Sequence, residues 1–178
     1  MALTDWVSNL VSVKKKQGMI RVYVDYRDIN KACPKDNFPT PFVDQMVDNF
    51  TRSEIFSLMD GFSGYNQINI LPADQHKTTF ICPWGMFAYR KLPFGLKNVG
   101  EMFQRAMSYA FHDIKHIVQP YLDDLPAHSM HCSDHPAHLR VIFLRCRFYL
   151  IRLNPHKCVF FVILTNSWAL LCHVKGSG

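Results

Sequence analysis

The stretch that decides the fold is Val118–Leu125, which reads V-Q-P-Y-L-D-D-L. Its apolar residues predict a strand, a turn and a second strand, with Asp123 and Asp124 at the tip. Two adjacent carboxylates repel each other, so they are tolerated where water solvates them or a cation neutralises them. Taken alone, Tyr121–Asp124 is most simply interpreted as a solvated turn.

A second apolar run, Ile55–Met59, also ends in a carboxylate, Asp60. If the two strands lie side by side, three carboxylates gather at one end of one sheet. Such oxygen ligands suit Mg²⁺, which leaves positions open for substrate phosphates. Paired metal ions about 3.5–4 Å apart would serve an in-line phosphoryl displacement. The pattern therefore favours a metal site at Asp60, Asp123 and Asp124.

Turn signals and periodic apolar runs alternate along the chain, which predicts mixed α and β structure. We expect strands over residues 19–26, 55–60, 65–71, 78–82 and 86–92. A short helix is expected over residues 42–50, and a longer one capped by Asn98. Another helix should begin near Ser133, with an inner face made of Leu139, Ile142, Phe143, Cys146 and Leu150.

The composition is that of a globular domain: 178 residues, 48% apolar and 19% charged, with a net charge of +6. The longest apolar run, Cys158–Leu164, has seven residues, which is too short to span a membrane. Asp5 interrupts the place where a secretory signal needs an apolar segment. The six cysteines form no C-x-x-C pair. We therefore expect an intracellular, reducing location without a disulfide framework.

A competing metal site needs weighing, because five potential zinc ligands crowd within eleven residues: His128, His131, Cys132, His135 and His138. A structural zinc site usually needs two ligand pairs at a characteristic separation. This cluster lacks the second pair, so zinc is the less favoured interpretation.

Several long motifs now make the chain recognisable. They are W-V-S-N-L-V-S-V-K-K-K-Q-G-M-I-R-V-Y-V-D-Y-R-D-I-N-K-A-C-P-K-D-N-F-P-T-P (6–41), F-S-L-M-D-G-F-S-G-Y-N-Q-I (56–68), K-L-P-F-G-L-K-N (91–98), F-Q-R-A-M (103–107), Y-L-D-D (121–124) and L-N-P-H-K-C-V-F (153–160). In this order and spacing, they resemble the reverse transcriptase of gypsy-class LTR retrotransposons, especially plant copies. The resemblance covers about residues 4–162.

The resemblance implies an α+β fold, the fingers and palm of a right-hand polymerase, with an antiparallel palm sheet backed by helices and no thumb. Residues 1–162 would form this domain. The fingers would take about 1–35 and 70–93, and the palm about 36–69 and 94–162. Residues 163–178 would be a divergent tail, a remnant of a primer-grip hairpin with Cys172 near a glycine position.

The resemblance also implies a function: RNA-directed DNA synthesis, adding deoxynucleoside triphosphates to a primer on an RNA or DNA template. Asp60, Asp123 and Asp124 match the family's catalytic and metal-binding carboxylates. The cofactor would be Mg²⁺, with Mn²⁺ as an alternative, and two ions would assist phosphoryl transfer. No membrane partner is expected, and the sequence does not indicate an oligomeric state.

The nucleotide-binding residues implied by the family are Arg21, Lys14, Lys15, Lys16, Tyr65, Phe94 and Gly95. Tyr65 would lie under the incoming sugar and exclude a 2′-hydroxyl, and Arg21 would touch the triphosphate. The three lysines would form a basic fingertip, and Phe94 and Gly95 would line the pocket. Without the resemblance, Tyr65 is an ordinary strand aromatic, the lysines are a solvated charge run, and Phe94–Gly95 is a turn.

The chain departs from the family at several positions, of which Pro126 is the most serious. A proline removes a hydrogen-bond donor from a strand, so we expect it to disturb the neighbouring metal site. Glu101 also adds negative charge near the expected template path. Pro126, the altered primer grip around Cys172 and the missing thumb together predict a poor polymerase, and the alternative is a non-catalytic remnant that binds nucleic acid weakly. A regular hairpin over residues 121–129 beside Asp60 would favour the enzyme.

Overall fold

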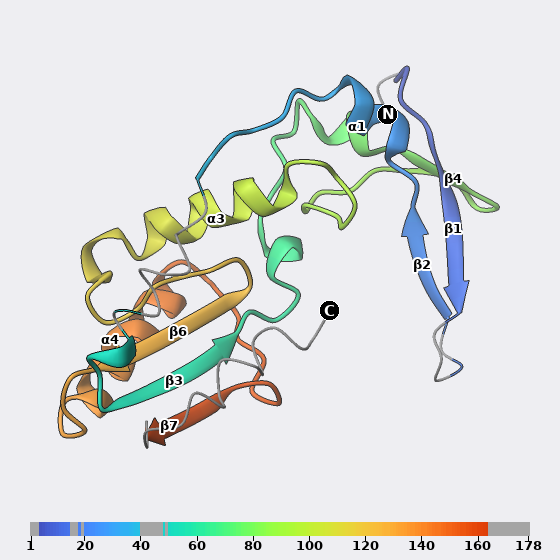
Figure 1. The fold of residues 1–178 in the computed structure, drawn as a ribbon. Coiled ribbons are helices and arrows are strands. Elements are labelled where there is room, and N and C mark those ends of the chain that lie inside the picture. Colours follow the sequence, from blue (N-terminus) through green and yellow to red (C-terminus); the bar gives the residue numbers. More distant parts are fainter. Residues whose placement is uncertain (1–3, 15–17, 19, 40–47, 49, 164–178) are drawn as a thin grey trace. The chain divides into compact units, whose positions relative to one another are not determined.

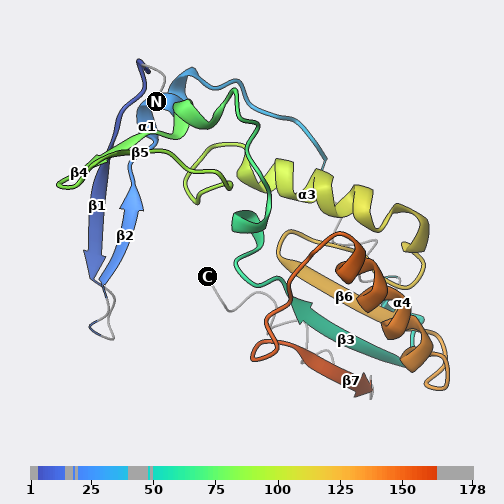
Figure 2. The same cartoon turned by 180° about the vertical axis from the view of Figure 1, so that it is seen from behind.

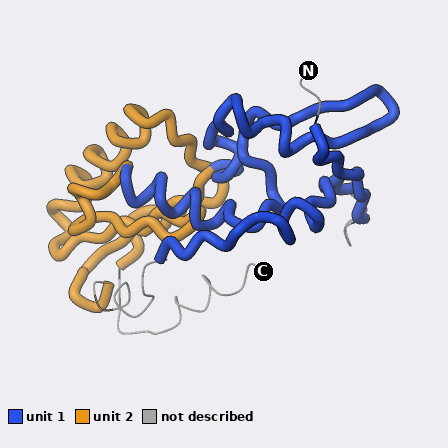
Figure 3. The backbone as a smooth tube through the Cα atoms, turned by 90° about the horizontal axis from the view of Figure 1, so that it is seen from above, with its two compact units in different colours: residues 1–40, 62–109 blue, residues 41–61, 110–178 orange. Residues whose placement is uncertain are grey.

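The structure is a computed structural model, and it describes residues 4–14, 18, 20–39, 48 and 50–163. The chain forms two compact units, residues 1–40 with 62–109 and residues 41–61 with 110–178 (Figure 3). The boundaries expected for fingers and palm stay predictions. Apart from residues 48, 50 and 163, the helix expected over 42–50 and the tail over 163–178 lie outside the described residues.

The first unit contains a four-stranded sheet in the order β2-β1-β4-β5 (Figure 1). Its strands are β1 (Ser8–Lys14), β2 (Ile20–Val24), β4 (Phe80–Cys82) and β5 (Gly85–Phe87). β1 and β4 run parallel, whereas β1–β2 and β4–β5 are antiparallel hairpins. The strands expected over residues 19–26, 78–82 and 86–92 are therefore present, and each is shorter than expected.

Four helical segments belong to the described part of this unit. They are α1 (Arg27–Ala32), the 3₁₀ turns η1 (Gly64–Gln67) and η2 (Gln75–Thr78), and α3 (Val99–Ala110). α3 carries an apolar stripe, with Phe103 and Met107 buried. The prediction that Asn98 caps α3 through its side chain was wrong, because its Oδ1 accepts a hydrogen bond from the Asp36 amide instead.

The strand predicted over residues 65–71 was also wrong, because its first part is the 3₁₀ turn η1. Ser63 has a φ of +49°, which turns the chain before the segment begins. Gln67 Nε2 then donates to the carbonyl of Phe62 at 2.7 Å. Extended pairing is limited to one bridge, between Asn69 and Lys91.

The second unit is built on a three-stranded antiparallel sheet in the order β6-β3-β7 (Figure 1). Its strands are β3 (Ile55–Asp60), β6 (Asp124–Ser129) and β7 (Val159–Ile163). β3 is central, and its residues Ile55, Phe56 and Met59 are buried. A continuous β3–β6 register runs from the Ile55–Ser129 pair to the Asp60–Asp124 pair.

The helices of this unit are the 3₁₀ turn η3 (His112–Ile114) and α4 (His135–Phe148). Figure 2 shows α4 lying across one face of the sheet. Leu139, Ile142 and Cys146 are buried as predicted, but Phe143 is 37% and Leu150 81% exposed. Leu150 lies beyond the last helical residue and has a φ of +57°, which carries it off the predicted face. Among the described residues, no helix is long and apolar enough to cross a membrane.

Candidate active site

The Tyr121–Asp124 segment forms a tight hairpin turn. Tyr121 N donates to the carbonyl of Asp124 and Asp124 N to that of Tyr121, each at 2.9 Å. Two residues, Leu122 and Asp123, therefore close the turn, and Leu122 has a φ of +49°. Positive φ at the first central residue is typical of type II′ hairpin turns, but it strains a leucine. The regular hairpin expected here is present.

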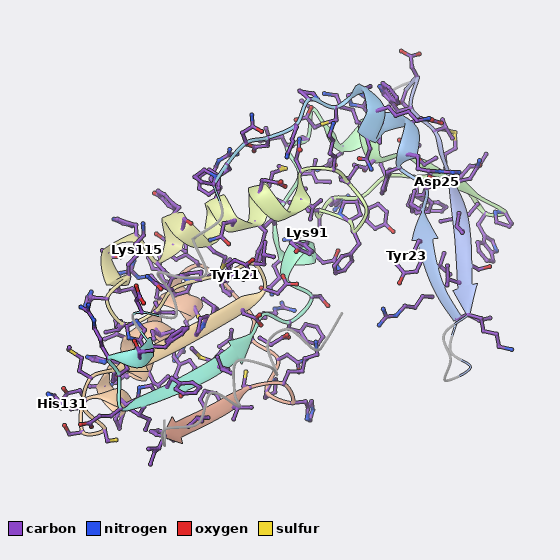
Figure 4. The ribbon with its side chains drawn as sticks, in the orientation of Figure 1. Tyr23, Asp25, Lys91, Lys115, Tyr121 and His131 are labelled. Atoms are coloured by element: carbon purple, nitrogen blue, oxygen red, sulfur yellow. The ribbon has the colours of Figure 1, made fainter. Side chains whose placement is uncertain are left out.

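The carboxylates of both predicted strand ends meet at one end of the sheet. Asp60 closes β3 and is the direct partner of Asp124 on β6. Gly61 N donates to the carbonyl of Asp123 at 2.8 Å, so the turn is tied to the same strand end. In Figure 4, Tyr121 marks this end of the sheet, and His131 lies at the opposite end.

The site holds an excess of negative charge. Burial raises the pKa of Asp123, and repulsion from Asp60 and then Asp124 raises it further. Burial and then repulsion from Asp60 likewise raise the pKa of Asp124. Asp123 Oδ1 is buried and has no hydrogen-bond partner among the described residues. A cation would therefore relieve both the repulsion and the unpaired oxygen.

One cationic side chain already lies beside these carboxylates. Lys157 Nζ is 3.4 Å from Asp60 Oδ2, and its charge lowers the pKa of both Asp123 and Asp124. The loop that carries Lys157 is anchored to β3, because Asn154 N donates to the carbonyl of Asp60 at 2.8 Å. Sequence analysis gave Lys157 no role. Nothing in its local pattern indicates which strand end the loop meets.

The donor chemistry of Asp60, Asp123 and Asp124 fits a hard divalent cation. In the part of the chain that the structure describes, no group of three His, Cys, Asp or Glu side chains is arranged to hold a metal ion by itself. Mg²⁺ does not require such a cage, since it is usually held by one or two carboxylates together with substrate phosphates and water. The unpaired Asp123 oxygen and the mutual repulsion are the observations that support this fit.

Pro126 does not disturb this arrangement, so the expectation that it would was wrong. It lies inside β6 opposite Leu58, without a register shift. Bonded and non-bonded pairs alternate in an antiparallel ladder. Counting from the bond between Gly61 N and Asp123 O, the Leu58–Pro126 pair is non-bonded. The backbone of Pro126 therefore faces away from β3, and its carbonyl accepts from Gln119 N at 3.2 Å.

The basic residues predicted at the fingertip do not all share one face. Val13 and Arg21 are cross-strand partners, so their side chains lie on the same face of the β1–β2 hairpin. Lys14 follows Val13 and therefore points to the opposite face. Lys15 and Lys16 lie outside the described residues. The structure thus separates Lys14 from Arg21 by the plane of the sheet.

Two aromatic rings, those of Phe94 and Phe103, contact the ring of Tyr65 in the first unit. The Tyr65 ring lies 5.3 Å from the Phe94 ring and 5.2 Å from the Phe103 ring, each near a right angle. Phe103 is buried and Phe94 is half exposed. Gly95 follows with a φ of +97°, a conformation that favours glycine. The predicted residues Tyr65, Phe94 and Gly95 therefore lie together, and sequence analysis missed the contribution of Phe103.

Three of the four histidines in the competing zinc prediction contact serines instead, and the fourth, His131, lies 3.6 Å from Glu54 Oε1. His135 Nε2 lies 2.8 Å from Ser57 Oγ, and its Nδ1 lies 2.7 Å from Ser129 Oγ. The same Ser129 hydroxyl lies 2.8 Å from His138 Nδ1, and His128 Nδ1 pairs with Ser53 Oγ at 3.1 Å. Burial lowers the pKa of His128 and His135. The serine–histidine network consists of Ser57, Ser129, His135 and His138, and Ser53 with His128 forms a separate pair.

Comparison with known proteins identifies the family of this chain. Residues 13–174 match the profile of the family described as "Reverse transcriptase (RNA-dependent DNA polymerase)". The chain therefore belongs to the reverse transcriptase family. It is 37% identical over 163 residues to the "Retrovirus-related Pol polyprotein from transposon 412" of Drosophila melanogaster. It is 32% identical over 150 residues to the "Transposon Tf2-3 polyprotein" of Schizosaccharomyces pombe.

These alignments cover 88% and 83% of this chain but only 13% and 11% of the two relatives. The chain thus corresponds to the reverse transcriptase domain of a retrotransposon polyprotein. Among solved structures, the foamy viral protease-reverse transcriptase in complex with double-stranded DNA matches with a TM-score of 0.78 and 20% identity, over 90% of this chain and 28% of that one. The native protease-reverse transcriptase of prototype foamy virus matches with a TM-score of 0.75 and 21% identity, over 86% of this chain and 20% of that one. These structures confirm the α+β fold of polymerase fingers and palm.

Proposed function

We propose that this chain performs RNA-directed DNA synthesis, adding deoxynucleotides to a primer paired with an RNA or DNA template. The observation that carries the proposal is the placement of Asp60, Asp123 and Asp124 at one end of one sheet, with a buried and unpaired oxygen among them. We further propose that the chain comes from a gypsy-class, plant-like element. The motifs quoted above support this assignment.

In this proposal Asp60, Asp123 and Asp124 hold Mg²⁺, with Mn²⁺ as an alternative. The chemistry such ions supply when bound is neutralisation of triphosphate charge and activation of the primer hydroxyl. The β3 and β6 backbones fix the carboxylates in place before substrate arrives, because the strand register and the tie at Gly61 leave little freedom. Lys157 offsets part of the negative charge at Asp60.

The nucleotide would be held by residues of the first unit. Tyr65, braced by the rings of Phe94 and Phe103, would present a rigid surface to the sugar and exclude a 2′-hydroxyl. Arg21 would contact the triphosphate, as would the fingertip lysines Lys14, Lys15 and Lys16. Gly95 would let the backbone turn beside the pocket. The foamy viral enzymes were solved with double-stranded DNA and with an RNA/DNA hybrid, which supports nucleic-acid partners of this kind.

Single-nucleotide primer extension with Mg²⁺ tests the proposal. We expect Asp123→Asn to abolish incorporation, since a neutral amide cannot hold the cation with the same strength. The matched control is Asp74→Asn, which removes one carboxylate from an exposed ion pair with Lys77 in the first unit. A control that loses activity equally would show a general charge effect. Robust incorporation by Asp123→Asn would contradict the assignment of the site.

The alternative is a non-catalytic remnant that binds nucleic acid weakly. The regular hairpin at Tyr121–Asp124 and the unbroken register opposite Asp60 favour the enzyme over the remnant. Wild-type chain that binds a primer–template but adds no nucleotide, with Mg²⁺ or Mn²⁺, would support the remnant instead.

A further inference from the structure

The loop between Leu92 and α3 has few hydrogen bonds of its own. Gly95 adopts a φ of +97° and has no side chain to bury, and Phe94 is 48% exposed, with its ring against Tyr65. The weak bond within the loop joins Val99 N to the Leu96 carbonyl at 3.4 Å. A loop of this kind needs outside contacts to keep one conformation.

A single side chain on α1 supplies two such contacts. Asn30 Nδ2 donates to the Gly95 carbonyl at 2.7 Å, and Lys97 N donates to Asn30 Oδ1 at 2.7 Å. The carboxamide of Asn30 therefore joins the carbonyl of one residue to the amide two positions later. This is the same pairing that a neighbouring strand would offer, and it fixes the peptide planes on both sides of Leu96.

Asn98, at the end of the loop, makes the corresponding pair of bonds back to the segment that follows α1. Asn98 Nδ2 donates to the Pro34 carbonyl at 2.8 Å, and Asp36 N donates to Asn98 Oδ1 at 3.1 Å. Each asparagine thus joins a carbonyl to the amide two residues later in the partner segment. These four bonds lock residues 30–36 to residues 95–98, more than sixty positions away along the chain.

We infer that Asn30 is a positioning residue that holds the Phe94–Lys97 loop in the conformation that receives the incoming nucleotide. The inference rests on the proposed function, because that function places Phe94 and Gly95 in the nucleotide pocket. The peptide planes held by Asn30 begin directly after Gly95, one residue from Phe94, whose ring meets Tyr65 near a right angle. The position requires a carboxamide, since it must donate and accept at once.

Two substitutions separate these roles. Asn30→Asp keeps an acceptor for Lys97 N but places a carboxylate oxygen against the Gly95 carbonyl, where it cannot donate. Asn30→Leu has a similar volume and removes both bonds. The matched control is Asn9→Asp, an exposed asparagine of the same unit whose side chain has no hydrogen bond among the described residues.

The experiment measures amide hydrogen exchange of the full chain together with KM and kcat for single-nucleotide addition. We expect Lys97 N–H to exchange about tenfold faster in Asn30→Leu and to stay protected in Asn30→Asp. Both variants should raise the KM for deoxynucleoside triphosphate roughly five- to tenfold, while kcat changes less than about twofold. Asn9→Asp should match the wild type in every measurement.

Unchanged Lys97 exchange in Asn30→Leu would show that Asn30 does not hold the loop. Faster exchange with an unchanged KM would show that the contact is structural only, and the positioning role would be overturned. A fall in kcat that accompanies a lower thermal midpoint, with KM unchanged, would overturn the positioning role for the same reason. Wild-type chain that incorporates no deoxynucleotide contradicts the proposed function, whereas the exchange data still decide whether Asn30 fixes the loop.

Discussion

Asp124→Asn should stabilise the metal-free chain, although it removes a residue of the proposed active site. Asp124 lies directly opposite Asp60, and repulsion between the two raises the pKa of Asp124 beyond the effect of burial. An asparagine has nearly the same shape and no charge. Folding of the variant therefore no longer has to bring two negative charges together.

The size of this stabilisation can be estimated from the distance between Asp60 and Asp124 across the strands. Opposite residues in a non-bonded antiparallel pair have Cβ atoms about 4.5–5.5 Å apart. Unit charges about 5.5 Å apart repel by about 0.8 kcal/mol in water and about 3 kcal/mol at an effective dielectric constant of 20. Asp124 is only half-buried and Lys157 offsets part of the repulsion, so the lower part of this range applies. We expect a gain of about 1 kcal/mol, or a thermal midpoint higher by about 2–4 °C.

The pH dependence of stability tests independently whether Asp124→Asn stabilises the chain. A carboxyl group with a raised pKa in the folded state contributes stability at low pH, and that contribution is lost as pH rises through the raised pKa. The advantage of Asp124→Asn over wild type should therefore be full at neutral pH. It should fade as pH falls toward the ordinary aspartate pKa of about 3.9.

Thermal unfolding followed by circular dichroism, with and without Mg²⁺, measures the effect. Mg²⁺ should raise the wild-type midpoint, because a ligand that binds the folded state stabilises it, and should raise the variant less. Asp74→Asn, at an exposed ion pair, should change the midpoint by less than about 1 °C. A lower midpoint for Asp124→Asn than for wild type at pH 7 without metal would refute the reasoning.

Three further predictions concern other features of the chain. Pro126→Leu restores a backbone N–H on the side of β6 that faces away from β3, so it should add about 0.5–1.5 kcal/mol to the free energy of unfolding. Primer extension should stay within about twofold of wild type, and a large rise in activity would show that the proline does impair the site. Tyr65→Ala should admit ribonucleotides more readily in extension assays, and an unchanged preference between the two sugars would contradict its role. Burial lowers the pKa of His135, so its contribution to the free energy of unfolding should be complete above the ordinary histidine pKa of about 6.5 and should decline as pH falls below that value. His135→Gln should flatten this decline when unfolding is measured against pH, and an unchanged slope would count against the prediction.

The features predicted well from the sequence are those written in local patterns. Ile55–Asp60 and the hairpin around Asp123 each combine a short apolar run with a polar end, and both form where expected. Their side-by-side placement follows from the sheet, because two strands that end in carboxylates need only pair antiparallel, with the second beginning where the first ends. The inner face of α4 was likewise predicted for Leu139 and Ile142, which are buried at helical spacing.

The predictions that were wrong or incomplete concern contacts between residues that are distant in the sequence. The alternation after Tyr65 is typical of a strand, but the rings of Phe94 and Phe103 hold Tyr65 within a 3₁₀ turn. Lys157 meets Asp60 from 97 residues away, and no spacing rule connects them. Asn98 has the right position for a helix cap, yet its side chain binds the Pro34–Asp36 segment.

The two ends of β3 show how the fold can keep a repulsive site in place. At one end Asp60 faces Asp124, and the bond from Gly61 N to the Asp123 carbonyl keeps the two strands from moving apart to relieve the repulsion, while Asn154 N fixes the Asp60 carbonyl from the other side. Toward the other end Ser57 joins three elements, because its hydroxyl contacts His135 of α4 and accepts from Phe161 N of β7. The serine–histidine network therefore anchors the central strand at a distance from the charges. Stability lost where the carboxylates meet is offset by these buried contacts, so the carboxylates can stay ready for a cation instead of relaxing away from it.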